Sequence, residues 1–319
     1  MPSISVILPA YNEEASIGAT IDRIAEAQRL APGLLDDLDV IVVSDGSTDQ
    51  TVAAATDRLR GHLSGTVIDL STNVGSHAAI RCGLAAARGD LLVVLAADGQ
   101  DPPEMLADIV AAFTPGVEVV WGRRKSRSHD PFLTRQLANL YYRLFRMLTG
   151  LHYPTSGIDV MAISRRASEI VQAYGERNAP VFLLVFNLGL RDAFVEYDRG
   201  ERLAGESGWS LRKRVRLAVD MLTSFSAAPI RMLSLVGVLV GAAGLLFGTI
   251  TLIRGLLGRI PVSGWASLMV VSSLMSGITL LAIGFLGEYV WRTLDEVRNR
   301  PLFIESSRTV VHFPGNEPD

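Results

Sequence analysis

Two long apolar runs near the C-terminal end constrain the fold of this 319-residue chain more than any other feature. Residues 232–253 and 265–287 contain no Asp, Glu, Lys or Arg. Each run is long enough for a helix that crosses a bilayer core of about 30 Å at about 1.5 Å per residue. Core helices of a large soluble domain can be equally apolar, but two such runs separated by a short segment favour membrane spans. We therefore predict two transmembrane helices, at about 232–253 and 265–287.

Basic residues around these runs predict their orientation. They are more numerous before the first run and after the second than between the runs, and Lys and Arg concentrate on the cytoplasmic side of membrane proteins. We therefore expect a multi-pass protein of the inner (plasma) membrane, with the N-terminal domain and both termini in the cytoplasm. The residues before the first run are Arg212, Lys213, Arg214, Arg216 and Arg231, those after the second are Arg292, Arg298 and Arg300, and those between are Arg254 and Arg259.

Short apolar segments alternate with helical patterns in the chain before the first run. The segments 3–11, 39–45, 66–71, 91–98 and 117–122 are rich in Val, Ile and Leu and almost continuously apolar, as strands covered on both faces are. The segments between them have helical spacing, with Ser, Asp or Pro near their starts. This alternation predicts an α/β domain with a mostly parallel sheet and helices on both faces, in which ligands bind beyond the carboxyl ends of the strands.

Three of these strand ends carry polar residues that could contact a ligand. At the first, attraction to a helix dipole explains Glu13 and Glu14 about as well as ligand binding does. At the second, helix capping explains Asp49 but not Asp45, which lies ahead of the turn and is expected to face the cleft. The third continues through Asn73 into a helix N-terminus that could meet a phosphate group.

A fourth strand end has the composition of a divalent-cation site. The segment ADGQDPPE at 97–104 contains Asp98, Gln100 and Asp101, whose oxygens are the ligands that Mg²⁺ prefers. A two-carboxylate clamp of the form Asp-x-Asp would need an acid at Ala96. Mg²⁺ is often held by one or two carboxylates together with a substrate's phosphates, so we expect this segment to bind metal weakly alone and more firmly together with a phosphate-bearing substrate. The alternative, capping of the next helix, accounts for Asp101 but leaves Asp98 and Gln100 unexplained.

Taken in order, these motifs resemble those of a known family. The set resembles the catalytic domain of GT-A fold glycosyltransferases of the dolichyl-phosphate mannose synthase type, and the later segments and two spans narrow the resemblance to bacterial polyprenyl-phosphate glycosyltransferases. The resemblance implies transfer of a sugar, with inversion, from a nucleotide diphosphate to the phosphate of a polyprenyl lipid. The motifs are SVILPAYNEEASI, VIVVSDGSTDQT, NVGSHAAIRCGLAAARGD, ADGQDPPE, GRRKSR, GIDVMAISRR and RLAGESGWSLRKRVRLAVDM.

The resemblance also implies roles for the strand-end residues. Those that would hold the donor nucleotide are Pro9, Tyr11, Glu13, Asp45 and Asn73. The metal, Mg²⁺ or Mn²⁺, would be held against the diphosphate by Asp98, Gln100 and Asp101, with Ala96 in place of the first acid of the motif. Because of that replacement, an enzyme that works without metal, or a member of the family without activity, remains an alternative.

The acceptor site needs cations more than a general base, because a phosphate monoester has a second pKa near 6 and is already anionic at neutral pH. The candidates for binding the two sets of phosphates are Arg123, Arg124, Lys125, Arg127, Arg202, Arg212, Lys213, Arg214 and Arg216. A solvated surface or a positive membrane flank explains the last four equally well. Asp159 lies where the family often has an acid near the acceptor, so we expect it to orient the incoming phosphate or hold a cation. Together with Asp98 and Arg202 it forms the predicted catalytic set.

These observations divide the chain into four parts. We expect a cytoplasmic GT-A domain at 1–206, an amphipathic juxtamembrane helix at 207–230, the two spans within 231–291, and a cytoplasmic tail at 292–319 that is either a short strand or disordered. The juxtamembrane segment has apolar residues on one face and most of its charges on the other, as helices in the interface plane do. Relatives often have Lys at the position of Gly208 and Arg at that of Met161, so phosphate contacts are expected to differ.

Composition and motifs limit the other functions. The net charge of −3 gives no reason to expect nucleic acid, and the one cysteine, Cys82, cannot form an internal disulfide. The N-terminal segment does not resemble a signal peptide. A transferase that elongates a glycan and a non-catalytic nucleotide-sugar-binding membrane subunit remain as alternatives, although the Gln-x-x-Arg-Trp motif usual in processive synthases is missing. By family frequency the donor is UDP-glucose, and similar enzymes assemble as homo-oligomers through their membrane segments.

Overall fold

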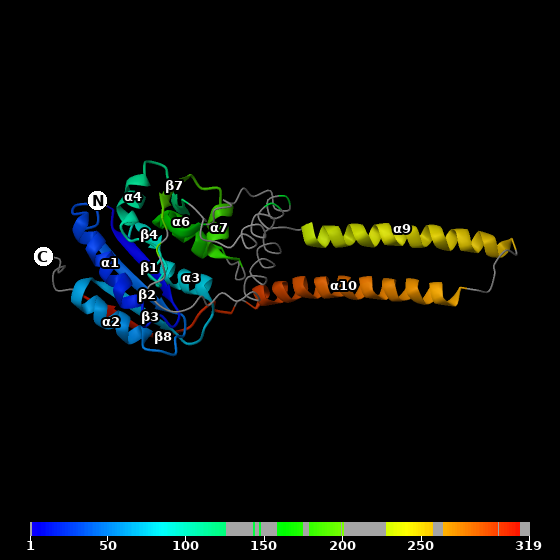
Figure 1. Cartoon of the computed structure of the whole chain (residues 1–319), viewed down its shortest axis with the longest axis horizontal. Helices are drawn as coiled ribbons and strands as arrows, with labels where there is room; N and C mark the ends of the chain where they lie inside the picture. The colour runs from blue at the N-terminus through cyan, green and yellow to red at the C-terminus, as the bar shows by residue number, and fades with distance from the viewer. Residues whose placement is uncertain are drawn as a thin grey trace. The chain divides into compact units, whose positions relative to one another are not determined.

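The computed structural model describes residues 2–125, 143, 147, 158–174, 179–198, 200, 228–257, 264–298 and 300–312. It divides into two compact units, one formed by Met1–Ala218 with Pro301–Asp319 and the other by Val219–Arg300 (Figure 1). The first unit contains a β-sheet with helices on both faces, and the second contains two long helices. Each unit is described by itself below.

An eight-stranded sheet with the order β7-β5-β6-β4-β1-β2-β3-β8 forms the centre of the first unit. Strand β1 pairs in parallel with β2 and β4, as do β2 with β3 and β5 with β7. Strand β6 is antiparallel to β4 and β5, and β8 is antiparallel to β3. The predicted α/β class with a mostly parallel sheet is therefore confirmed. The strands are β1 Ile4–Ala10, β2 Leu38–Ser44, β3 Gly65–Leu70, β4 Leu91–Val94, β5 Val119–Arg124, β6 Ile158–Ser164, β7 Asp192–Tyr197 and β8 Glu305–Val311.

Helices cover both faces of this sheet, as the continuous apolar strands require. Helices α1, α2 and α4 pack on the face that carries Val6 and Val40, whereas α3 packs on the opposite face with α6 and α7. Gly83 allows α3 to approach closely, because a Cβ there would lie 2.4 Å from the Ile7 side chain. The helices are α1 Ile17–Leu30, α2 Thr51–His62, α3 Ser76–Ala86, α4 Met105–Ala112, α6 Arg165–Ala173 and α7 Val181–Asn187.

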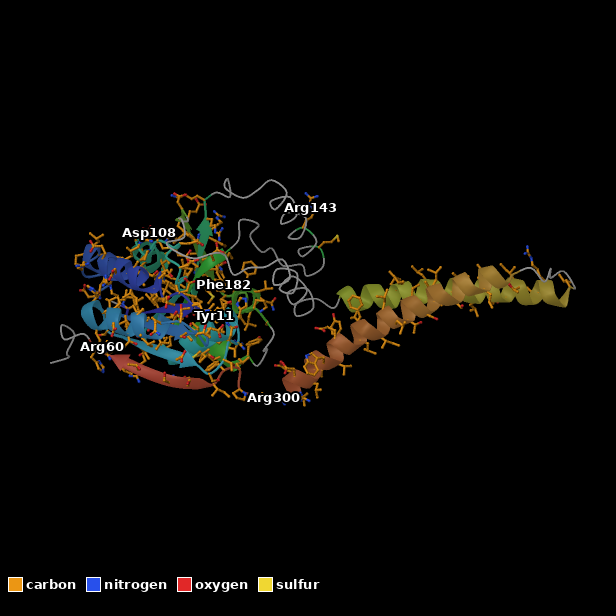
Figure 2. The ribbon with its side chains drawn as sticks, turned by 60° about the horizontal axis from the view of Figure 1, so that its bottom comes forward. Tyr11, Arg60, Asp108, Arg143, Phe182 and Arg300 are labelled. Atoms are coloured by element: carbon orange, nitrogen blue, oxygen red, sulfur yellow. The ribbon has the colours of Figure 1, made fainter. Side chains whose placement is uncertain are left out.

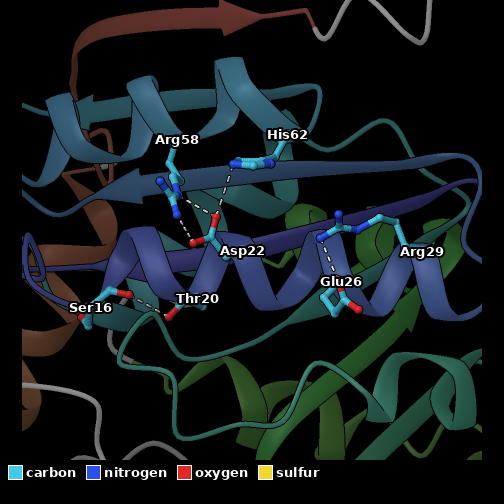
Figure 3. A network of polar contacts seen from close by, with 7 residues as sticks. All are labelled: Ser16, Thr20, Asp22, Glu26, Arg29, Arg58 and His62. Carbon is cyan, nitrogen blue, oxygen red and sulfur yellow. Dashed lines mark hydrogen bonds and ion pairs between the residues drawn. The ribbon is translucent and has the colours of Figure 1, made fainter.

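Helices α1 and α2 lie side by side and are linked by polar side chains (Figure 3). Asp22 of α1 accepts hydrogen bonds from the Arg58 guanidinium of α2, with Nε 2.5 Å from Oδ1, and His62 Nε2 lies 3.6 Å from the same carboxylate oxygen. These groups are largely in contact with solvent, which screens the ion pair, so it contributes little to stability. The apolar side chains on the sheet side, such as Ile21 and Leu59, therefore dominate the packing of both helices.

The C-terminal segment returns to the sheet of the first unit. The sequence predicted either a short strand or disorder for this tail. Residues Glu305–Val311 form β8, which pairs with β3 in register from Gly65↔Val311 to Asp69↔Ser307 and with a shift before Leu70↔Glu305. The side chain of Val311 is buried in the core. The structure thus differs from the predicted division at 292, since helix continues to Val297 and the following strand belongs to the sheet.

The second unit consists of α9, Ala228–Leu256, and α10, Trp265–Val297, which contact each other. They include the predicted spans, and the windows Ser234–Thr251 and Leu274–Val297 are long and apolar enough to cross a membrane. The consecutive residues Leu245, Leu246 and Phe247 are 75%, 64% and 67% exposed, so apolar side chains face outward around the helix (Figure 2). Of the predicted juxtamembrane helix, residues 207–227 lie outside the described residues, and 228–230 begin α9.

Candidate active site

The loops that follow β1 and β2 are joined by hydrogen bonds at the carboxyl edge of the sheet. Asn12, in the left-handed region with φ of 55°, accepts at Oδ1 from the Thr48 backbone N–H at 2.9 Å. The Glu13 N–H donates to Thr51 Oγ1 at 2.9 Å, and the Glu14 carboxylate accepts from the Gln50 N–H at 2.9 Å. Glu14 thus accepts from the backbone at the start of α2, a role that the helix-dipole interpretation of α1 did not include.

The predicted donor residues of the first loop differ in exposure. Pro9 is half-buried in β1, and Tyr11 is 46% exposed beyond the end of that strand (Figure 2). The Glu13 carboxylate accepts a hydrogen bond from Ser16 Oγ at 2.6 Å, at the start of α1. Tyr11 is therefore the member of this group whose side chain is most open to a ligand.

Asp45 holds the loop that leads into α3. Its two carboxylate oxygens accept from the backbone N–H groups of Val74 and Gly75, at 2.7 and 2.9 Å. Burial raises the pKa of Asp45, and these two donors offset part of that rise. Gly46 packs on the same loop, since a Cβ there would lie 2.5 Å from the Thr72 carbonyl carbon. Asp45 is thus not a helix cap, and it fixes a loop in which Asn73 is exposed.

The turn that follows β4 is fixed by its own carboxylates. Asp98 is buried and accepts at Oδ1 from the Gln100 N–H at 3.1 Å. Asp101 is 2% exposed, and its oxygens accept from the Ala96 N–H at 2.9 Å and the Tyr197 hydroxyl at 3.1 Å. The N-cap of α4 is Glu104, without a side-chain hydrogen bond, so the capping interpretation of Asp101 is wrong.

Side chains of helix α1 also donate hydrogen bonds to the backbone of this turn. Thr20 Oγ1 donates to the Ala97 carbonyl at 3.0 Å, and Arg23 donates to the Gly99 carbonyl at 2.7 Å. On the far side, the Gly200 N–H donates to the Gln100 carbonyl at 2.8 Å. The backbone on both sides of Asp98 is therefore held by elements that are distant in sequence.

Three carboxylates influence one another at this edge. Burial raises the pKa of Asp101 to about 6, and the charges of Asp159 and Asp98 add to the rise. Asp159, near the start of β6, forms an ion pair with Arg124 of β5. Burial and the nearby Asp101 and Asp159 carboxylates raise the pKa of the Tyr197 hydroxyl, which therefore remains protonated at neutral pH. A divalent cation would relieve the repulsion among these carboxylates, so their chemistry fits a metal.

This arrangement by itself is not a complete protein cage for a metal. In the part of the chain that the structure describes, no group of three or more His, Cys, Asp or Glu side chains is arranged to hold an ion. Mg²⁺ can be held by one or two carboxylates plus substrate phosphates, and Asp98 with the Gln100 side chain matches that smaller requirement. The roles predicted for Asp98, Gln100 and Asp101 as metal ligands remain predictions.

Predicted phosphate-binding cations at the end of β5 and just after it pair with carboxylates at the end of β7 and just after it. Arg123 lies 2.5 Å from Glu196 and stacks over the Phe194 ring at 5.4 Å, and Lys125 lies 3.3 Å from Asp198. Both pairs are largely exposed, so a phosphate could compete with them at low cost. The other predicted phosphate-binding residues lie outside the described residues; they are Arg127, Arg202, Arg212, Lys213, Arg214 and Arg216.

Sequence reasoning missed several residues that organise the site. Tyr197, Thr20 and Arg23 contact the turn around Asp98 from other elements, and Arg124 was grouped with its basic neighbours although its partner is Asp159. The sequence carried no signal for these contacts, because Tyr197 and Asp101 are 96 positions apart. The fold and the site thus define a class, that of α/β proteins with a mostly parallel sheet, in which ligands bind beyond the carboxyl ends of the strands.

Comparison with known proteins identifies the family. The sequence profile of glycosyl transferase family 2 matches residues 5–171, just over half of the chain, and the chain belongs to this family. A Bacillus subtilis protein, the uncharacterized glycosyltransferase YkcC, is 35% identical over 94% of this chain and 92% of its own length. The SfII prophage-derived bactoprenol glucosyl transferase of Shigella flexneri is 32% identical over 94% of this chain and 96% of its own.

A further relative and a solved structure are also similar to this chain. The undecaprenyl-phosphate 4-deoxy-4-formamido-L-arabinose transferase of Aeromonas hydrophila is 32% identical over 94% of this chain and 92% of its own. Among solved structures, Mycobacterium tuberculosis glucosyl-3-phosphoglycerate synthase in complex with Mn²⁺, UDP-glucose and phosphoglyceric acid is 23% identical, with a TM-score of 0.47, over 68% of this chain and 76% of that one. The chain is thus a glycosyltransferase, and two of its relatives are named for sugar transfer involving a bactoprenol or undecaprenyl-phosphate lipid.

Proposed function

We propose that this chain transfers a sugar from a nucleotide diphosphate sugar to polyprenyl phosphate, with inversion at the anomeric carbon. The observation that carries the proposal is the meeting of two strand ends, where Asp98 and the Arg124–Asp159 pair lie at one edge of the sheet in a chain with two membrane-length helices. The names of the two lipid-related relatives support the same acceptor. A soluble acceptor would give no reason for the helices α9 and α10.

The donor would lie across the loops after β1, β2 and β3. Tyr11 is open for contact with the nucleoside, and Asp45 holds the loop of Asn73 at the start of α3, where backbone N–H groups favour phosphate. Asp98 and Gln100 would hold Mg²⁺ or Mn²⁺ against the diphosphate. Bound there, the metal would offset the negative charge that develops on the leaving diphosphate.

The acceptor phosphate would approach from the side of β5 and β6. Arg124 is fixed against Asp159, so a guanidinium and a carboxylate lie together next to the predicted diphosphate site. An anionic phosphate oxygen of the lipid attacks the anomeric carbon, and the bond from that carbon to the diphosphate oxygen breaks. No general base is needed, because the attacking group is already ionised at neutral pH. Arg124, Arg123 and Lys125 orient this phosphate.

Glucose is our proposed sugar and UDP our proposed nucleotide. One relative is named for glucosyl transfer and another for transfer of a modified arabinose, so the acceptor chemistry recurs among relatives while the sugar varies. The non-catalytic alternative rests on Ala96, Met161 and Gly208, and the assay below tests it directly.

We also propose an inner-membrane location with both termini in the cytoplasm. Strand β7 precedes the two long helices in sequence and β8 follows them, yet both strands belong to one sheet. A sheet cannot be divided by a bilayer, so the chain between β7 and β8 crosses the membrane an even number of times. An even number of crossings agrees with the distribution of basic residues, which predicts that both ends of the chain lie on the cytoplasmic side. Homo-oligomers would form through the exposed apolar surfaces of α9 and α10.

The test is transfer by membranes that contain the full-length protein. They are incubated with labelled UDP-glucose, or another labelled nucleotide sugar, and polyprenyl phosphate, with Mg²⁺ or with EDTA. A labelled lipid that depends on the polyprenyl phosphate supports the proposal. No labelled lipid with any donor would favour a non-catalytic subunit, and label in a polymer would favour glycan elongation.

A further inference from the structure

We propose that Asp101 and Tyr197 are positioning residues, which set the place of Asp98 relative to Asp159, and that Asp101 is not a metal ligand. This inference rests on the proposed function, because it concerns the same site. It corrects the simplest interpretation of the sequence, in which every acid of ADGQDPPE is a ligand. It also explains how a site with Ala96 in place of an acid keeps a defined geometry.

The first step is the closure of the turn by Asp101. Its carboxylate reaches back to the Ala96 N–H at 2.9 Å, so the side chain spans the segment 96–101 in which Asp98 lies. The second oxygen accepts from the Tyr197 hydroxyl at 3.1 Å. With 2% of its surface exposed, Asp101 is directed into the protein by two donors from opposite sides. Its contacts are those of a clamp on the backbone.

The second step is the link from this clamp to the acceptor side. Tyr197 of β7 is in register with Arg124 of β5, and Arg124 forms the ion pair with Asp159 of β6. The Tyr197 ring is buried, and a Cβ at Gly122 would lie 3.3 Å from it and 2.6 Å from the Val160 side chain. The absence of a side chain at Gly122 therefore leaves room for the buried ring.

These contacts would set the position of Asp98 relative to the Arg124–Asp159 pair. Asp98 would bind the metal and diphosphate, and Arg124 with Asp159 would bind the lipid phosphate, so the attacking and leaving oxygens must be aligned across them. A misplacement of about 1 Å can reduce a rate about a hundredfold. The hydrogen bonds from Ala96 and Tyr197 to Asp101 connect the two sides within the protein.

Three substitutions separate a clamp from a ligand. Asp101→Asn keeps an oxygen that can accept from the Ala96 N–H, and its amide can donate to the Tyr197 oxygen, so the clamp can be kept without its charge. Tyr197→Phe removes the hydroxyl and leaves the carboxylate available to a metal. Asp101→Ala removes both contacts. The matched controls are Asp108→Asn on the exposed side of α4 and the exposed Tyr174→Phe.

The measurements are the transfer rate per folded protein, the half-saturating Mg²⁺ concentration, the binding of Mg²⁺–UDP and thermal unfolding. The clamp predicts that Tyr197→Phe and Asp101→Ala each lose about 10- to 100-fold in transfer rate, the range found for residues that orient metal ligands. Asp101→Asn should retain at least about a third of the rate and shift the Mg²⁺ requirement by no more than about threefold, on the same scale.

The inference would be overturned if Asp101→Asn were impaired more than Tyr197→Phe. If Asp101→Asn raises the Mg²⁺ requirement as much as Asp98→Asn does, while Tyr197→Phe is almost normal, Asp101 is a ligand. If all folded variants transfer at the wild-type rate, the contacts are structural. Failure of the proposed function is distinguishable, because wild type would then bind Mg²⁺–UDP without making labelled lipid. In that case the variants' order of Mg²⁺–UDP affinity still decides between clamp and ligand.

Discussion

Replacing Ala96 by Asp should convert a metal site that depends on nucleotide into one that binds metal by itself. Ala96 is half-buried in the turn after β4, and its backbone N–H is already held by Asp101. A carboxylate added there joins those of Asp98, Asp101 and Asp159. Burial raises the pKa of Asp101, and the charges of Asp159 and Asp98 add to the rise. Without metal the variant should be less stable than wild type, because like charges repel. With Mg²⁺ bound, the added carboxylate and that of Asp98 would act as ligands, and the effect of the substitution on stability reverses in sign.

The size of the effect follows from linkage. A second carboxylate that tightens metal binding tenfold contributes about 1.4 kcal/mol when the site is saturated. For a domain of this size, about 1 kcal/mol corresponds to about 2–4 °C in Tm, so Mg²⁺ should raise the Tm of Ala96→Asp by about 3–6 °C more than that of wild type.

The assay is thermal unfolding of the full-length protein in detergent, with Mg²⁺ or EDTA and without nucleotide. Ala96→Asn is the matched control, because it adds nearly the same volume without a charge. Equal Mg²⁺ shifts in Ala96→Asp, Ala96→Asn and wild type would refute the assignment of this turn to metal binding.

Three further changes test other parts of the structure. Asp45→Ala should lower the free energy of unfolding by about 1–3 kcal/mol and raise the KM for the donor, because two backbone N–H groups lose their acceptor; an unchanged KM would separate Asp45 from the donor site. Asp39→Asn should raise Tm at pH 8 but not below pH 3.8. Burial raises the pKa of Asp39 in the folded protein, so wild type loses folding stability as the pH rises through that pKa, whereas Asn does not ionise. An equal effect on Tm at both pH values would refute this explanation. Ending the chain at Phe303 removes β8 and should speed thiol labelling of Cys82, whose pKa burial raises to about 12; continued protection of the thiol would show that β8 does not shield it.

The sequence predicted the parts of the fold that depend on local pattern. The segments 39–45 and 66–71 became β2 and β3 almost residue for residue, since buried parallel strands are continuously apolar. The pattern could not predict which strands pair antiparallel. Strand β8 has the exposed polar residues Ser306, Ser307 and Arg308 and follows the long helix α10, so its place beside β3 depends on pairing with a strand far away in the sequence.

The sequence predicts the position of some candidate site residues but not their contacts. Asp45 and Asp98 follow apolar segments of the sequence, and in the structure both lie beyond the carboxyl ends of strands. That Asp45 would hold the loop at Val74, or that Tyr197 would hold Asp101, could not be derived from the sequence. Such contacts join positions far apart in the chain, and no local propensity encodes them.

Sugar transfer to a lipid phosphate is proposed to depend on Asp98 in the turn after β4, and one measurement tests this most directly. Labelled lipid is quantified from membranes containing equal amounts of folded wild type or Asp98→Ala, with UDP-glucose, Mg²⁺ and polyprenyl phosphate. We predict a labelled lipid from wild type, its loss with EDTA, and a rate at least about a hundredfold lower for Asp98→Ala, consistent with loss of a metal ligand. Equal transfer by wild type and Asp98→Ala would contradict the account, because Asp98 would then only stabilise the turn.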